Sequence, residues 1–210
     1  MPNKCFVNLN VNGKDCQIAI DERESLYDTL RNQLNLTSVK KGCEVGECGA
    51  CSVLLNGRCV DTCIYLTKWA EGKKIITVEG LCDEDGNLTD VQKQFIKEAA
   101  VQCGFCTPGF ILKAVEIVGD NKPYTRDEIR KLISGNLCRC TGYMNIVTAI
   151  EHAIYNNMKA QGKDYKLADN YVTYLAAGEK EKTKMTDEVI NVQQSPYNLS
   201  NVEPVFKQDK

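Results

Sequence analysis

Two short motifs decide the fold of this chain: Gln102-Cys103-Gly104-Phe105-Cys106-Thr107-Pro108-Gly109-Phe110 and Gly135-Asn136-Leu137-Cys138-Arg139-Cys140-Thr141-Gly142-Tyr143. Each contains a close pair of cysteines at a point where the sequence predicts that a helix begins. Thr107 can cap a helix whose first position is Pro108, because proline lacks the amide hydrogen that this position leaves unpaired. Two such helix starts, facing each other, would direct free N–H groups and positive dipole ends at whatever the four thiolates hold. The pocket would therefore suit an anionic group.

A [2Fe–2S] cluster held by four thiolates is such a group, and hydrogen bonds to its sulfurs tune its reduction potential. The spacing of these two pairs alone does not decide the metal. C-x2-C and C-x-C pairs can also hold zinc. Both metals stay open for this quartet on spacing alone.

A second group of cysteines earlier in the chain has a more specific spacing. Cys43-x4-Cys48-x2-Cys51, followed at a distance by Cys63, is the plant-type [2Fe–2S] pattern. Structural zinc sites usually show repeated C-x2-C pairs instead. Interleaved glycines would let this loop close over a cluster with its amides pointing at sulfur, and they stand at positions 42, 46 and 49. The pattern predicts an iron–sulfur cluster.

Composition narrows the class of protein. The 210 residues carry a net charge of −2, which implies no broad attraction to nucleic acid or to an anionic membrane. No apolar run approaches the ~20 residues that cross a bilayer. The N-terminal residues show neither an apolar signal core nor a twin-arginine motif, so we expect a cytoplasmic protein.

The chain holds twelve cysteines. In a cytoplasmic protein such a number points to metal binding or redox chemistry rather than to disulfides. We expect the four cysteines outside the two groups to be ordinary buried or half-buried thiols, namely Cys5, Cys16, Cys59 and Cys82. His152 is the only histidine, which excludes Rieske-type ligation.

Residues 1–81 predict a small α+β domain. Residues 5–20 read as a hairpin around Asn12-Gly13, and Asn-Gly between alternating runs is a strong hairpin signal. Ser25 is expected to cap a helix. Further strands are expected at 52–55, at 59–66 with Cys63 on it, and at 75–78.

From Thr89 the apolar period changes to 3.6 residues, which predicts a small four-helix bundle within residues 82–160. The first helix should bury one face, formed by Val91, Phe95, Ile96 and Ala99. Residues 161–210 are polar with isolated aromatics. They predict an extended tail that is disordered alone or becomes ordered on a partner.

Taken in order, the motifs Gly-Cys-x-x-Gly-x-Cys-Gly-Ala-Cys, Gln-Cys-Gly-Phe-Cys-Thr-Pro-Gly and Gly-Asn-Leu-Cys-Arg-Cys-Thr-Gly-Tyr resemble the iron–sulfur subunit of the xanthine dehydrogenase family of molybdenum hydroxylases. The similarity covers about residues 3–158 and excludes the tail. It is strongest to the small subunits of bacterial xanthine dehydrogenases. The fold that the resemblance implies is a β-grasp, ferredoxin-like domain (1–81) followed by a four-helix [2Fe–2S] bundle (82–160) and a tail (161–210).

The resemblance also implies roles for individual residues. The ferredoxin-like cluster facing a flavin subunit would be held by Cys43, Cys48, Cys51 and Cys63. The cluster nearer molybdenum would be held by Cys103, Cys106, Cys138 and Cys140. Gln102 and Cys140 would lie against the pterin of the molybdenum cofactor. The cofactors would be two [2Fe–2S] clusters here, with the molybdenum cofactor on a large partner subunit and FAD on a medium one.

We therefore expect an electron-transfer subunit of a complex that hydroxylates a purine such as xanthine, with no catalytic activity of its own. Nicotinate, carbon monoxide and aldehyde hydroxylases share the cysteine motifs and remain alternatives. A free ferredoxin-like carrier and a structural double-zinc protein are the rival classes. Iron and acid-labile sulfide separate the zinc protein from the others, and co-purifying partner subunits separate the carrier.

Overall fold

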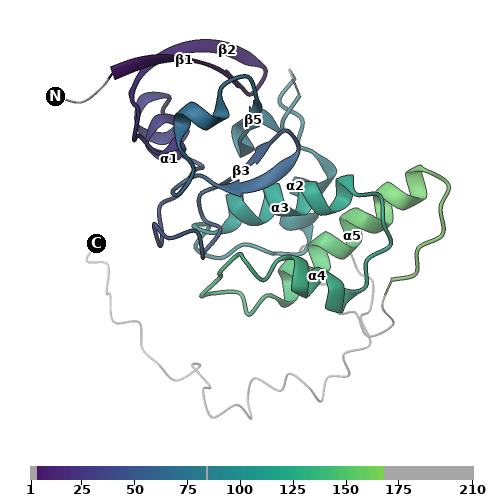
Figure 1. Cartoon of the computed structure of the whole chain (residues 1–210). Helices are drawn as coiled ribbons and strands as arrows, with labels where there is room; N and C mark the ends of the chain where they lie inside the picture. The colour runs from purple at the N-terminus through teal and green to yellow at the C-terminus, as the bar shows by residue number, and fades with distance from the viewer. Residues whose placement is uncertain (1–3, 84, 168–210) are drawn as a thin grey trace, which may run out of the picture. The chain divides into compact units, whose positions relative to one another are not determined.

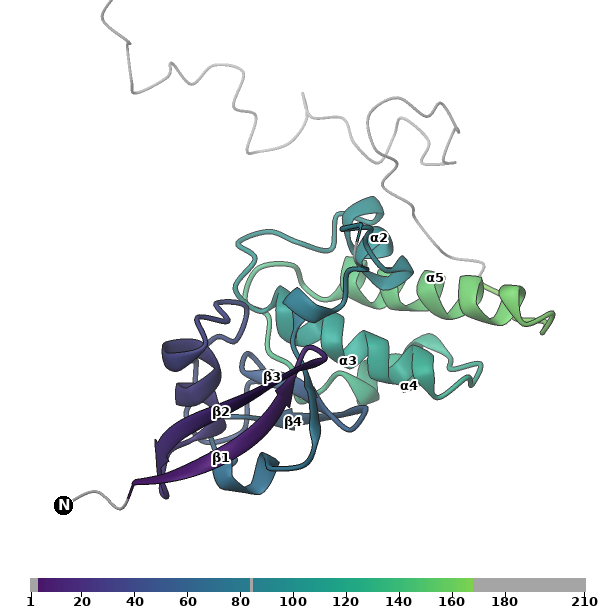
Figure 2. The ribbon, with the colours of Figure 1, turned by 90° about the horizontal axis from the view of Figure 1, so that it is seen from above.

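The structure is a computed structural model, and it describes residues 4–83 and 85–167. It is an α+β fold, as predicted, with a five-stranded sheet of order β2-β1-β5-β3-β4 followed by four α-helices. In both ribbon views the helices α2 to α5 gather on one side, with β3 beside α3 (Figures 1 and 2). The strand order places the β1–β2 hairpin at the sheet edge away from β3 and β4. Among the described residues, none of the helices combines the length and apolar character that a membrane span needs.

The sheet begins with the predicted hairpin, formed by β1 (Lys4–Val11) and β2 (Lys14–Asp21). Its turn residues Asn12 and Gly13 have φ of 52° and 77°. Positive φ at both central residues is what a type I′ turn requires, and its twist matches that of the strands. The Asn-Gly signal thus sets the register of the first two strands.

The predicted cap of the first helix is confirmed, but the helix is short. The Ser25 hydroxyl accepts from the Asp28 amide at 3.1 Å, and α1 (Leu26–Asp28) continues as a π-helical turn, η1 (Thr29–Gln33). Leu26 and Leu30 are fully buried in the core of the sheet domain. Apolar spacing predicted the buried face, whereas it carries no signal for π-helical hydrogen bonding.

The second hairpin, β3 (Ser52–Leu55) and β4 (Arg58–Asp61), ends earlier than predicted. The strand expected over 59–66 stops at Asp61 because the buried Thr62 hydroxyl donates to the Cys51 carbonyl at 2.7 Å and turns the chain. Cys63 therefore lies in the loop after β4 and not on a strand. The chain continues through the 3-10 turn η2 (Thr67–Ala70), β5 (Lys74–Ile76) and the 3-10 turn η3 (Val78–Gly80).

Four helices follow: α2 (Asp90–Lys97), α3 (Thr107–Gly119), α4 (Arg126–Leu132) and α5 (Met144–Ala160). Capping boxes begin α2 and α4, where Thr89 and Thr125 exchange hydrogen bonds with the residue three positions on. Such reciprocal bonds satisfy amides that a helix start leaves unpaired. The predicted bundle is confirmed.

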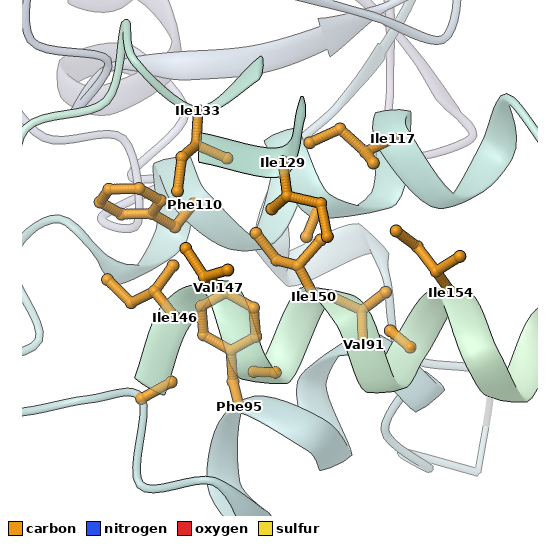
Figure 3. Packing of buried hydrophobic residues seen from close by; sticks show 14 of the residues in the cluster. Val91, Phe95, Phe110, Ile117, Ile129, Ile133, Ile146, Val147, Ile150 and Ile154 are labelled. Atoms are coloured by element: carbon orange, nitrogen blue, oxygen red, sulfur yellow. The ribbon is translucent and has the colours of Figure 1, made fainter. Parts of the chain in front are cut away.

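The bundle core is built mainly of isoleucine, together with alanine, valine and phenylalanine, and all four helices contribute to it (Figure 3). Phe95 and Phe110 are almost fully buried, and Ile150 lies between α5 and its neighbours. Two residues of the predicted face are wrong, because Ala99 is exposed beyond the end of α2 and Ile96 is 66% exposed. Ile96 follows Phe95 by one position and so points about a quarter-turn away from the core.

The predicted helix starts at the cysteine pairs need two corrections. The N-cap of α3 is Cys106 and not Thr107, and no side chain caps it. Cys138 and Cys140 lie in a loop before α5, whose N-cap is Tyr143 with φ of 68°. The second pair is therefore not at a helix start, and among the described helices α3 is the one whose N-cap residue is a cysteine.

The described chain does not end with α5. Tyr165 contacts the bundle core, and its hydroxyl donates to the Tyr124 carbonyl at 2.5 Å. The greater part of the predicted tail, 161–210, lies outside the described residues. The predicted domain limits at 81/82 and 160/161 stay predictions.

The buried Ile150 and the exposed Ile96 provide a test of the core packing. Replacing Ile150, which is 0% exposed, with alanine should cost about 2–5 kcal/mol, because it removes buried methyl groups and leaves a cavity. Ile96→Ala should change stability by no more than about 0.5 kcal/mol. Thermal unfolding followed by circular dichroism measures both, and equal losses would contradict the described packing.

Candidate metal centres

The first cysteine quartet lies at one end of the sheet. The loop between η1 and β3 supplies Cys43, Cys48 and Cys51, and the loop after β4 supplies Cys63. Cys51 is buried, whereas the other three are partly exposed. The early end of β4 thus brings Cys63 to the loop that the sequence pattern had already identified.

Backbone amides surround one sulfur of this quartet. Val45 and Glu47 donate their N–H groups to Cys43 Sγ at 3.5 and 3.3 Å. These hydrogen bonds favour the thiolate and lower the pKa of Cys43 to about 6. Burial acts in the opposite direction on Cys51 and raises the pKa of its thiol to about 12. A bound metal cation would offset that burial cost by pairing with the thiolate charge.

The second quartet comes from two loops of the bundle. Cys103 lies in the loop before α3 and Cys106 is the N-cap residue of that helix, while Cys138 and Cys140 lie in the loop before α5. Cys138 Sγ accepts the Thr141 amide at 3.4 Å and lies 3.1 Å from the Thr141 hydroxyl. Partial burial opposes ionisation, but the Thr141 hydrogen bonds outweigh it and lower the pKa of Cys138.

Each of the eight thiols has a neighbouring thiol within its own quartet. The pairs are Cys43 with Cys48, Cys51 with Cys63, Cys103 with Cys140, and Cys106 with Cys138. Within the described ranges, no three His, Cys, Asp or Glu side chains converge as a single-ion site would need. Neighbouring thiols fit a binuclear cluster, in which each of the two irons takes two thiolates.

Close backbone packing joins the two quartets. The Leu137 amide donates to the Cys48 carbonyl at 3.0 Å, and the Asn136 side chain donates to the Gly49 carbonyl at 3.3 Å. Gly109 on α3 lies against the same loop, and a β-carbon on it would stand 2.1 Å from the Gly49 oxygen. Leu137 adjoins Cys138, so one hydrogen bond connects a cysteine of one quartet to the neighbour of a cysteine of the other.

Glycine also shapes the loop of the first quartet. A β-carbon at Gly42 would lie 2.9 Å from Cys48 Sγ, so only glycine lets the backbone approach this sulfur. Gly49 has φ of 64°, and a side chain there would clash with Asn136. Amides aimed at sulfur and neighbouring thiols in both quartets, with bare backbone beside Cys48 in the first, fit a [2Fe–2S] cluster in each quartet.

His152, singled out as the only histidine of the sequence, and Trp69, the only tryptophan, have ordinary roles. His152 on α5 is largely buried and lies 3.1 Å from the Glu98 carboxylate. Trp69 is mostly exposed and stacks edge-on against Tyr65 with ring centroids 5.6 Å apart. Sequence reasoning missed Asn136 and Gly109, although a glycine inside an otherwise apolar helix is a signal of close backbone approach.

Comparisons with known proteins agree with this geometry. Residues 9–82 match the 2Fe-2S iron-sulfur cluster binding domain, and residues 77–151 match the [2Fe-2S] binding domain. The nicotinate dehydrogenase small FeS subunit of Eubacterium barkeri is 47% identical over 72% of this chain and 96% of its own. The chain belongs to the iron–sulfur subunits of the molybdenum hydroxylases.

Two further relatives show how widely this subunit is shared. The xanthine dehydrogenase iron-sulfur-binding subunit of Escherichia coli O157:H7 is 47% identical over 69% of this chain and 91% of its own. The crystal structure of quinoline 2-oxidoreductase from Pseudomonas putida 86 contains a chain with a TM-score of 0.71 and 39% identity, covering 77% of this chain and 99% of that one. The iron–sulfur subunit described here thus carries two [2Fe–2S] clusters and serves an oxidoreductase without being catalytic itself.

Two glycines of α3 test the contact between the quartets. Gly109→Ala should displace the loop at Gly49 and lower both thermal stability and iron content, because its β-carbon would overlap the Gly49 oxygen. Gly119→Ala has no atom within 4 Å of its β-carbon and should be neutral or stabilising by up to about 1 kcal/mol. Iron analysis and thermal unfolding of both variants measure this, and a Gly109→Ala protein with full iron and unchanged stability would contradict it.

Proposed function

We propose that this iron–sulfur subunit carries electrons from a molybdenum-binding large subunit to FAD on a medium subunit, within a complex that hydroxylates a nitrogen-containing aromatic ring. Each bound [2Fe–2S] cluster supplies one-electron redox chemistry. This chain would hold the two clusters with eight thiolates. These are Cys43, Cys48, Cys51 and Cys63 for the ferredoxin-like cluster, and Cys103, Cys106, Cys138 and Cys140 for the bundle cluster. The single observation that carries the proposal is the backbone hydrogen bond from Leu137 to Cys48.

That hydrogen bond provides a short route between the quartets. From Cys138 the route crosses one peptide bond to Leu137, then its amide, and then the Cys48 carbonyl. Both end residues are proposed cluster ligands. The route therefore needs no side chain between the two centres, and the backbone fixes its length.

The exposure of the bundle quartet supports its position at the molybdenum end of this route. Gln102, Cys103 and Cys140 are exposed, so the bundle quartet reaches the surface. Exposed apolar side chains flank them, namely Val101, Phe105, Leu137 and Met144. An apolar rim around an exposed redox centre is typical of a surface that a partner covers. We assign this surface to the molybdenum-binding large subunit, with Gln102 and Cys140 in contact with the pterin.

The ferredoxin-like quartet has its own exposed apolar neighbours. Val45 and Ile64 are 63% and 58% exposed, and Ile64 lies against Gly46 in the loop of the quartet. We assign this second surface to the FAD-binding medium subunit. Two partner surfaces at opposite ends of one route make the chain a connector and not a free carrier. The thiols that it uses stay reduced in the cytoplasm, where we place the complex.

A purine such as xanthine is the substrate that we propose to assay first. The relatives named for nicotinate, xanthine and quinoline all act on nitrogen-containing aromatic rings, which supports this class of substrate. The nicotinate relative is as similar to this chain as the xanthine relative, so nicotinate is the second candidate. Carbon monoxide and aldehydes are further alternatives.

Two cysteine substitutions test the proposed ligands. Cys138→Ser should remove the bundle cluster and halve the iron from about four per chain, while the spectrum of the other cluster persists. Cys59→Ser is the matched control, because Cys59 lies on β4 outside both quartets. It should leave iron content unchanged. Iron analysis and electron paramagnetic resonance measure both variants, and a loss of iron on Cys59→Ser would disprove Cys63 as the fourth ligand.

Purification of the intact complex tests the assembly and the substrate. Affinity capture through this subunit should recover a molybdenum-containing and an FAD-containing subunit, and the complex should oxidise xanthine. The isolated chain should show no turnover. Activity on nicotinate alone would redirect the substrate assignment, whereas capture of the chain without partners would contradict the connector role.

A further inference from the structure

The loop from Cys138 to Tyr143 contains a closed set of hydrogen bonds around one sulfur. The Cys138 amide donates to the Tyr143 hydroxyl at 2.9 Å, and the Tyr143 amide donates to Thr141 Oγ1 at 3.2 Å. Thr141 Oγ1 in turn lies 3.1 Å from Cys138 Sγ. Each step begins where the previous one ends, so the loop returns to the cysteine from which it started.

These bonds fix the direction of the Thr141 hydroxyl. Between a thiol and a hydroxyl either group can donate, but a thiolate bound to iron has no proton to give. The Tyr143 amide already occupies an acceptor position on Thr141 Oγ1. In the loaded protein the Thr141 hydroxyl must therefore donate its proton to Cys138 Sγ.

Tyr143 holds this arrangement at a conformational cost. Its φ of 68° lies in the left-handed region, which is uncommon for residues other than glycine, asparagine and aspartate. Its ring meets Phe110 edge-on with centroids 6.1 Å apart, which anchors the side chain to the bundle core. The aromatic contact and the hydroxyl acceptor for the Cys138 amide offset that strain, and they place the Tyr143 amide beside Thr141.

We propose that the Thr141 hydroxyl is a positioning and tuning group that raises the reduction potential of the bundle cluster, with Tyr143 holding it in place. The inference rests on the proposed assignment of Cys138 as a ligand. A donor to sulfur stabilises the reduced, more negative form of a cluster more than the oxidised form. Among the described residues, Thr141 donates the one hydroxyl hydrogen bond to a sulfur of either quartet. The effect should therefore be confined to the bundle cluster.

The raised potential of the bundle cluster would also affect the direction of electron transfer along the route between the quartets. A higher potential at the bundle cluster would favour its taking an electron from the exposed side at Cys140. The first quartet has amide donors to Cys43 and no hydroxyl donor in the described part of the chain. Thr141 thus gives the chain a means to set the potential of one cluster independently of the other.

The test is a potentiometric titration of the intact complex followed by electron paramagnetic resonance, which resolves the two clusters. Thr141→Val keeps the amide donor and the side-chain shape but removes the hydroxyl. It should lower the midpoint potential of the bundle cluster by about 59 mV, a tenfold change in the reduction equilibrium of a one-electron couple. Thr141→Ser restores the hydroxyl and should recover the original potential. The ferredoxin-like cluster should keep its potential in both variants.

Thr107→Val is the matched control, because Thr107 follows Cys106 as Thr141 follows Cys140. Among the described residues its hydroxyl makes no hydrogen bond to a sulfur, whereas that of Thr141 lies 3.1 Å from Cys138 Sγ. It should leave both potentials unchanged. Thr141→Ala tests the same loss of the hydroxyl with less bulk. Unchanged potentials in the valine and alanine variants, with full iron, would overturn the proposal. Loss of the bundle cluster from both, with retention in Thr141→Ser, would also overturn it, since the hydroxyl would then hold the loop instead of tuning the sulfur.

If Cys138 is not a ligand, the Cys138→Ser variant keeps its full iron content in the iron analysis described above. Failure of the ligand assignment is thereby distinguishable from failure of the tuning role, in which Cys138→Ser loses iron but Thr141→Val shifts no potential.

Discussion

The structure depends on one close approach of backbone to backbone, at which the loop of the first quartet meets the bundle. The Leu137 amide bonds to the Cys48 carbonyl, and the Gly49 carbonyl accepts from Asn136 while lying against Gly109. A side chain on either Gly49 or Gly109 would push the loop of the first quartet away from the bundle. Because the contact is made by main-chain atoms and glycine, it fixes the distance between the two quartets more firmly than packed side chains could.

Main-chain atoms also provide most of the hydrogen bonds to the cysteine sulfurs. An anionic cluster needs donors aimed at its thiolates, and this chain supplies them mostly from the backbone, through Val45 and Glu47 at Cys43 and Thr141 at Cys138. Backbone donors keep their direction, since no rotamer change can remove them. Loops that point several amides at one sulfur must adopt unusual dihedrals, and they do so at Gly49 and Tyr143. The apolar core shown in Figure 3 anchors the loop at Tyr143 through Phe110.

The sequence was informative wherever local chemistry determines structure. The Asn12-Gly13 turn, the Ser25 cap and the helical periods were all predicted, because turn dihedrals, capping bonds and apolar spacing are local properties. Two of the misses concern residues whose conformation is set by contacts with residues elsewhere in the chain. Cys63 lies outside its predicted strand because the Thr62 hydroxyl bonds to the Cys51 carbonyl. The helix predicted to begin at the Cys138/Cys140 pair has Tyr143 as its N-cap. The positions of the eight cysteines could be read from spacing, whereas the contact of Cys48 with Leu137 could not, because it joins residues far apart in the chain.

The central claim is that two [2Fe–2S] clusters lie close enough for electrons to pass directly between them through this chain. Electron paramagnetic resonance of the fully reduced holoprotein tests it most directly. The account predicts two distinct signals of equal spin intensity, with a magnetic interaction that broadens or splits both at low temperature. A single signal, or two signals with no interaction between them, would contradict it.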